Sequence, residues 1–273
     1  MDNQGLALAD VVSVEAWHDS FSPEITAVDL FVDAVFSVGR LGAEADAQVA
    51  FELCVRRADV VVVVPPSEPL AVDPASVCRD TPLVQAKRTK ATKKSRAWGM
   101  SISALAKLLP TGPSGSGSLG GEAGLKGSSE ESIEIIETLS AMAVKSSKTD
   151  DAQYRWTLLP TLREFLDGRP WNAKAEPRLK LVDLRKKKTG LPPTVRVEVR
   201  CRREDLVIRN IKLKDRARND AAWSRTGARN REVAAEAYIR DQLLRRGLVV
   251  GDLRDASALM TLTMTFAEAR PVY

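Results

Sequence analysis

Histidine and cysteine are scarce in this chain, which limits the metal chemistry that it can support. His18 is the sole histidine, so a zinc site built on several histidines is excluded. The three cysteines, Cys54, Cys78 and Cys201, are far apart and form no C-x-x-C pair, so a disulfide framework is not expected. We therefore expect reduced thiols, no bound metal and no cofactor.

Long apolar runs are also missing, and we expect no secretory leader. No stretch of about 18 apolar residues is present, so the sequence predicts no membrane-spanning segment and no membrane partner. The first four residues, Met-Asp-Asn-Gln, lack the basic start and apolar core of a signal peptide. With 44% apolar and 28% charged residues, the composition is typical of a globular protein, and we expect a cytoplasmic location.

Charge is distributed unevenly along the 273 residues. Residues 1–86 carry a net charge of −10, residues 87–150 carry +4 and residues 151–273 carry +11. A chain polarised in this way can dock its halves on each other or associate with other copies. It can also offer its basic half to an anionic partner.

Alternating apolar residues predict several β-strands. Val28 to Val38 and Val49 to Val55 alternate with polar neighbours, as in strands with one buried face, and Val60 to Val64 is apolar on both sides. In the basic half, residues 195–202 alternate, with Val195, Val197, Val199 and Cys201 expected inward and Arg196, Glu198, Arg200 and Arg202 outward. The last strand is expected to place Leu262, Met264 and Phe266 on one face.

The two halves share a sequence pattern that indicates an internal repeat. Residues 49–62 align with 195–208 with six identities, and Val28-Asp29-Leu30 recurs as Val182-Asp183-Leu184. Two similar alternating strands could also resemble each other by chance, but the ordered pair of matches favours duplication. We expect three superposable strands in each half, with Asp59 and Asp205 in equivalent turns.

The predicted fold class is α+β and β-dominated, with two related, sandwich-like antiparallel units. The domains expected are an acidic unit at 1–86, a basic run and flexible Gly/Ser-rich linker at 87–131, and a basic unit at 132–273. A helix over 232–246 accompanies the second unit, with an apolar stripe and Gly247 just past its end.

No catalytic motif emerges, and the sequence favours a non-enzymatic protein. Gly115 to Gly120 matches G-x-G-x-x-G, but it lies in a Gly/Ser/Pro tract instead of between a strand and a helix. His18 is expected at the surface or in a loop, without a nucleophile beside it. Asp29 and Asp33 share the outer face of one strand and are interpreted as solvated charges.

The cysteines in the two repeats are interpreted as unreactive. Cys201 falls on the inward face of its strand and is expected in the core. Cys54 points with Glu52, and the sequence names no partner that would activate it. Glu52 and Glu198 recur in both units, which indicates a structural role.

Basic residues of the second half are the remaining candidates for function. A basic strand face and its loops can neutralise several phosphates without reading sequence, but the aromatic residues that would stack bases are missing. The first hypothesis is a binding protein whose basic half contacts RNA, DNA or another polyanion, and the alternative is a scaffold or assembly subunit that pairs acidic and basic units. The candidate polyanion-binding residues are Lys186, Lys187, Lys188, Arg196, Arg200, Arg202, Lys212 and Lys214.

Overall fold

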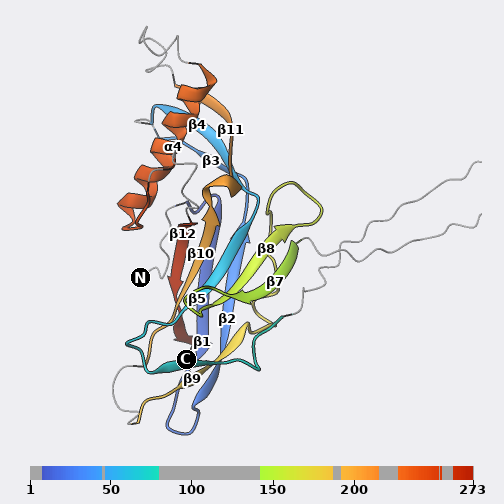
Figure 1. Ribbon diagram of the computed structural model, residues 1–273, viewed down its shortest axis with the longest axis vertical. Helices are drawn as coiled ribbons and strands as arrows, with labels where there is room; N and C mark the ends of the chain where they lie inside the picture. The colour runs from blue at the N-terminus through green and yellow to red at the C-terminus, as the bar shows by residue number, and fades with distance from the viewer. Residues whose placement is uncertain are drawn as a thin grey trace, which may run out of the picture. The chain divides into compact units, whose positions relative to one another are not determined.

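A computed structural model describes residues 8–44, 47–79, 142–186, 192–214, 227–251, 253 and 261–272 of the protein (Figure 1). All of them belong to one compact unit, which is formed by Met1–Gln85 and Leu139–Tyr273. A second unit, Ala86–Thr138, lies outside the described residues, as do the predicted linker and the G-x-G-x-x-G match. No helix in the described parts of the chain has the length and apolar character needed to cross a membrane.

Sheet A has five strands and contains the basic strand that the sequence singled out. All its pairings are antiparallel. In spatial order the strands are β12 (Thr261–Glu268), β10 (Arg196–Arg202), β5 (Ala58–Val63), β8 (Tyr154–Pro160) and β7 (Met142–Lys148). The strand β10 is thus internal, with a neighbour on each side.

Sheet B also has five strands, and one of its pairings is parallel. The strand β1 pairs antiparallel with β2 and parallel with β13, close to the C-terminus. The spatial order is β13 (Arg270–Val272), β1 (Val12–Asp19), β2 (Ala27–Phe36), β9 (Leu179–Asp183) and β6 (Leu70–Asp73).

Sheet C is smaller and is covered by the helix α4 (Ala228–Arg245). Its strands are β11 (Leu206–Leu213), β4 (Val49–Val55) and β3 (Gly39–Leu41), and a short 3-10 turn, η1 (Arg203–Asp205), leads into β11. Of the stripe that the sequence predicts, Ala235, Ile239 and Leu243 are buried and Tyr238 is half-buried. The helix begins earlier than expected, and Gly247 follows it with a φ of +72°.

The core lies between the inner faces of sheets A and B. Alternate residues of β1 and β2, such as Val14 and Val32, are fully buried, and they share one hydrophobic cluster with Val60 and Val197 of sheet A. Trp156 fills the interior beneath β8, where its ring meets that of Trp171 edge to face at 6.2 Å. The class is therefore β-dominated with one described helix, as predicted.

The two predicted β-rich domains do not fold as separate units. Strands from 1–86 and from 132–273 occur together in all three sheets: β5 enters sheet A, β9 and β13 enter sheet B, and β11 enters sheet C. The alternation of apolar residues shows which face of a strand is buried, but it does not show which strand lies beside it. The sequence therefore could not distinguish two small sheets from one interleaved set.

The segments of the suspected repeat pair with each other and do not form two separate three-stranded units. The strand β4 pairs with β11 and β5 pairs with β10, so the aligned strands β4 and β10 lie in different sheets. Asp205 precedes β11, but Asp59 lies within β5, so the predicted equivalent turns are wrong. Duplication of the sequence stays a prediction.

Candidate polyanion-binding surface

The strand β10 presents its arginines on the outer face of sheet A. Val197, Val199 and Cys201 are buried in the core, whereas Arg196 and Arg200 keep 42% and 27% of their side chains exposed. Because directly paired residues of an antiparallel sheet share a face, the outer face continues onto Val61 and Asp59 of β5. The inward and outward sets agree with the alternation in the sequence.

Glu198 lies between the two arginines and is shared by them. Arg200 donates a hydrogen bond from Nε to Oε2 of Glu198 at 2.8 Å, and Nη1 of Arg196 lies 3.6 Å from Oε1. The hydroxyl of Thr263 on β12 donates a longer bond to Oε2 at 3.4 Å. Two guanidinium groups thus share one carboxylate, and Arg200 uses only its Nε to bind it.

Phe266 supports Arg196 from the neighbouring strand. The guanidinium carbon of Arg196 lies 4.1 Å from the centre of the Phe266 ring, which is a cation–π arrangement. The sequence had placed Phe266 on the same face as Leu262 and Met264. A register shift between Val199 and Arg200 reverses the alternation of β12 after Met264, so Phe266 turns outward.

Two further cations lie on this outer face and were not among the predicted residues. Arg155 on β8 is in register with Val61, and Lys145 on β7 is in register with Thr157. Asp59 accepts a hydrogen bond from the Thr157 hydroxyl at 2.6 Å and lies 3.7 Å from Arg155. The strand pattern of residues 154–159 could have shown that Arg155 points away from the core, but not that β8 joins the same sheet.

We call this set the arginine surface: Lys145, Arg155, Arg196 and Arg200, with Asp59 and Glu198 between them. Its acidic side chains are less exposed than its arginine side chains, at 11% for Glu198 and 20% for Asp59, against 27% to 42% for the arginines. Glu268, on the edge strand β12 and in register with Arg196, is an exposed carboxylate at its border. Among the ion-paired side chains of this surface, the arginines are therefore the more exposed partners.

The other predicted residues lie elsewhere in the fold. Arg202 ends β10, is exposed and pairs with Glu204 at 3.2 Å. Lys212 and Lys214 belong to β11 and the residue that follows it, in sheet C, where the ammonium group of Lys214 donates to the carbonyl of Glu44. Lys186 is exposed beyond the end of β9 in sheet B, and Lys187 and Lys188 fall outside the described residues. The structure therefore does not gather the predicted set into one patch.

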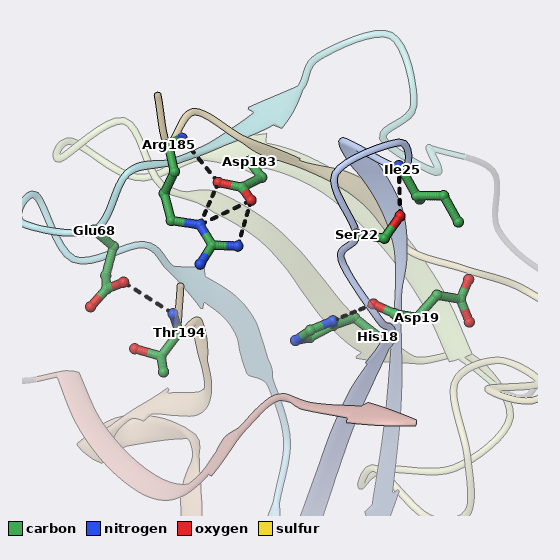
Figure 2. A network of polar contacts seen from close by, with 8 residues as sticks. All are labelled: His18, Asp19, Ser22, Ile25, Glu68, Asp183, Arg185 and Thr194. Carbon is green, nitrogen blue, oxygen red and sulfur yellow. Dashed lines mark hydrogen bonds and ion pairs between the residues drawn. The ribbon is translucent and has the colours of Figure 1, made fainter. Parts of the chain in front are cut away.

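Figure 2 shows the polar contacts around the end of β9 and the end of β1, where Arg185 and His18 lie. Arg185, next to Lys186, donates from both Nε and Nη2 to the carboxylate of Asp183. His18 lies in β1 and is only 1% exposed, so its predicted surface or loop position is wrong. Its Nδ1 lies 2.7 Å from the carbonyl oxygen of Asp19. The alternation Val12, Val14, Ala16 in β1 could have placed His18 on the buried face.

The other carboxylates considered in the sequence, Asp29, Asp33 and Glu52, lie on strands. Asp33 accepts a hydrogen bond from Arg169 at 2.9 Å on the outer face of sheet B, but one carboxylate oxygen of Asp29 is buried without a hydrogen-bond partner. Glu52 lies between Arg209, at 3.2 Å, and Arg40, at 3.8 Å, and so repeats the shared-carboxylate arrangement of Glu198.

Neither a metal site nor a comparison with known proteins gives a further indication of function. Among the described residues, no group of three or more histidine, cysteine, aspartate or glutamate side chains is placed to hold a metal ion. No protein-family model matches the sequence, and no curated protein matches it either.

Proposed function

We propose that the protein is a non-enzymatic binding protein whose arginine surface contacts nucleic acid or another polyanion. The observation that carries this proposal is the greater exposure of the arginine side chains of the arginine surface compared with the acidic side chains that they contact. Glu198 contacts both Arg196 and Arg200, and Asp59 contacts Arg155, so the carboxylates hold the arginines in place. A guanidinium group has five N–H donors, so donors remain for phosphate oxygens.

Recognition by this surface would depend on the phosphate backbone and not on the bases. Phe266, the aromatic ring that Arg196 packs on, has one face covered by the guanidinium group, and that face cannot stack on a base. Interactions with phosphate give affinity that is independent of sequence and falls with salt. We expect similar affinities for unrelated sequences of the same length.

The test replaces Arg155, Arg196 and Arg200 together with glutamine. Because these side chains lie on the solvent face, the fold should persist, as checked by thermal unfolding. Fluorescence anisotropy with labelled single- and double-stranded DNA of unrelated sequences should show weaker binding for all of them. The slope of log affinity against log salt should flatten by about one for each phosphate that the variant no longer neutralises.

A matched control changes the same charge at other places. Arg40, Arg163 and Arg245 are exposed and ion-paired, and they lie on β3, in the segment after β8 and on α4. The glutamine triple variant at these positions should bind like wild type. An equal reduction of affinity in both triple variants, or no binding by the wild type at low salt, would overturn the proposal.

A second candidate is a scaffold or assembly subunit, for which the outer face of sheet B offers a partner surface. This face carries Glu15, Asp29 and Asp33 beside the rings of Trp17 and Phe31, which stack at 5.8 Å. It is of mixed charge, because Arg169 pairs with Asp33 and Lys180 is in register with Asp29. Its carboxylates on one copy could contact the arginine surface of another. Sedimentation at low and high salt distinguishes the candidates, because only this one predicts a salt-sensitive oligomer that the first triple variant disrupts.

The proposal includes a cytoplasmic location. It is supported by the cysteines, since Cys54, Cys78 and Cys201 are all free thiols, as is usual in a reducing compartment.

A further inference from the structure

Cys78 differs from the other cysteines in its surroundings. It lies half-buried after β6, and its backbone is fixed on both sides: its N–H donates to the carbonyl of Arg178, and its own carbonyl accepts from Trp156 Nε1, both at 2.8 Å. The Arg178 guanidinium donates from Nη2 to the Cys78 sulfur at 3.0 Å. The sulfur is therefore held in place beside a positive charge.

Arg178 is a buried cation with too few acceptors. Its side chain is 0% exposed and lies over the Trp171 ring at 4.6 Å, and its carboxylate partner, Glu176, is 3.2 Å from Nη2 and is 40% exposed. The buried Nε and Nη1 atoms of Arg178 have no hydrogen-bond partner. Buried donors of this kind usually find an acceptor, because leaving them unpaired costs free energy.

Burial lowers the pKa of Arg178, and the negative charges available at Cys78 and Glu176 oppose that effect. An oxygen atom bonded to the Cys78 sulfur would bring a further acceptor next to the guanidinium. Because Nη1 and Nη2 are bonded to the same carbon in a rigid plane, the unpaired Nη1 lies beside the nitrogen that already contacts the sulfur.

The other two cysteines lack this combination. Cys54 and Cys201 are 0% and 3% exposed, and burial raises the pKa of both thiols. A buried thiol that stays protonated is a poor nucleophile. Among the three, only Cys78 combines partial exposure with a direct contact to a cation.

We propose that Cys78 is a site of reversible oxidation by a peroxide. The sulfur attacks one peroxide oxygen, so that an S–O bond forms as the O–O bond breaks and the second oxygen leaves as hydroxide with the bonding electron pair. Sulfur is oxidised by two electrons, the peroxide is reduced, and the product is a sulfenic acid whose oxygen accepts from Arg178. An external thiol can then condense with the sulfenic acid, release water and form a mixed disulfide that a second thiol reduces.

The experiment treats the native chain with hydrogen peroxide and traps sulfenic acid with a cyclic 1,3-dione, followed by intact mass and peptide mapping. We expect one adduct per chain, on the peptide that contains Cys78, and none in Cys78→Ser. Adducts on Cys54 or Cys201 in the native chain instead of Cys78 would overturn the proposal.

A comparison with unfolded wild type separates activation from simple exposure. An ordinary exposed cysteine is only about 3% thiolate at pH 7, so a folded site that stabilises the thiolate can be oxidised faster than the same cysteine in the unfolded chain. We expect Cys78 to be oxidised at least about threefold faster in the native chain than in urea. A slower reaction in the native chain would refute the role of Arg178. This comparison uses wild type alone, so it does not require that any variant fold.

A conservative pair of variants tests Arg178 itself. Arg178→Lys keeps the charge but removes Nε and the second terminal nitrogen, so the trapped yield should fall. Arg169→Lys, an exposed change in the same segment, should leave the yield at the wild-type level. Equal yields in the two folded variants would contradict the role given to Arg178. This site is independent of the arginine surface, so failure of either proposal leaves the other standing.

Discussion

Replacing Glu198 with glutamine should lower stability and strengthen polyanion binding at the same time. The Glu198 side chain is 11% exposed, and its carboxylate contacts Arg200 at 2.8 Å and Arg196 at 3.6 Å. Hydrogen bonds to charged groups contribute about 1.5–3 kcal/mol, and glutamine keeps the shape and one acceptor oxygen. We therefore expect the free energy of unfolding to fall by about 1–2 kcal/mol in Glu198→Gln.

The same change leaves Arg196 and Arg200 without the charge between them. If the arginine surface binds phosphates, affinity for DNA should rise, and the salt dependence should steepen by up to about one unit. Urea unfolding and fluorescence anisotropy on the same preparation measure the two effects. Glu204→Gln is the control, because Glu204 is 66% exposed, its ion pair with Arg202 is at the surface, and exposed pairs contribute little. Equal stability of the two variants would refute the reasoning.

Two further predictions concern the framework of the fold. Burial raises the pKa of Asp205, and Arg57 opposes this effect. One carboxylate oxygen of Asp205 is also buried and unpaired, so folding favours the protonated acid. The free energy of unfolding therefore falls as pH rises from about 4, the unfolded pKa, through the higher folded pKa. Asp205→Asn should therefore be more stable than wild type by about 0.5 kcal/mol at pH 7, with the gain shrinking below pH 4, as urea unfolding at both pH values will show. Gly42→Ala should lower the free energy of unfolding by at least about 2 kcal/mol more than Gly247→Ala does. Both glycines have a positive φ, at +79° and +72°, but of the two only Gly42 has no room for a Cβ, which would collide with the Val49 carbonyl. Similar destabilisation of these two variants would show that backbone conformation alone sets the cost.

Features that depend on one element could be predicted from the sequence. The outward arginines of β10 and the buried stripe of α4 follow from the periodicity of a strand and of a helix. The β-dominated class follows in the same way, because alternating segments are frequent along the chain.

Features that depend on the pairing of distant strands could not be predicted. Arg155 and Lys145 join the arginine surface because β8 and β7 lie beyond β5, which no local pattern indicates. The outward position of Phe266 depends on a register shift, and a shift of one residue moves every following side chain to the other face. The burial of Arg178 beside Cys78 joins residues 100 positions apart, and no local pattern around either residue indicates it.

The interleaved strand order has a consequence for how the protein is made. The strand β1 has β2 as one neighbour, but its other neighbour, β13, ends at Val272. A nascent chain that has reached residue 79 contains one of the five strands of sheet A, so the apolar faces of β1, β2 and β5 have no opposing layer. Contacts between residues so distant in sequence make folding slow, and uncovered strands can pair with other chains meanwhile. Sheet A therefore cannot be completed before β12 has been synthesised, and until then the N-terminal strands expose apolar faces that other chains can contact.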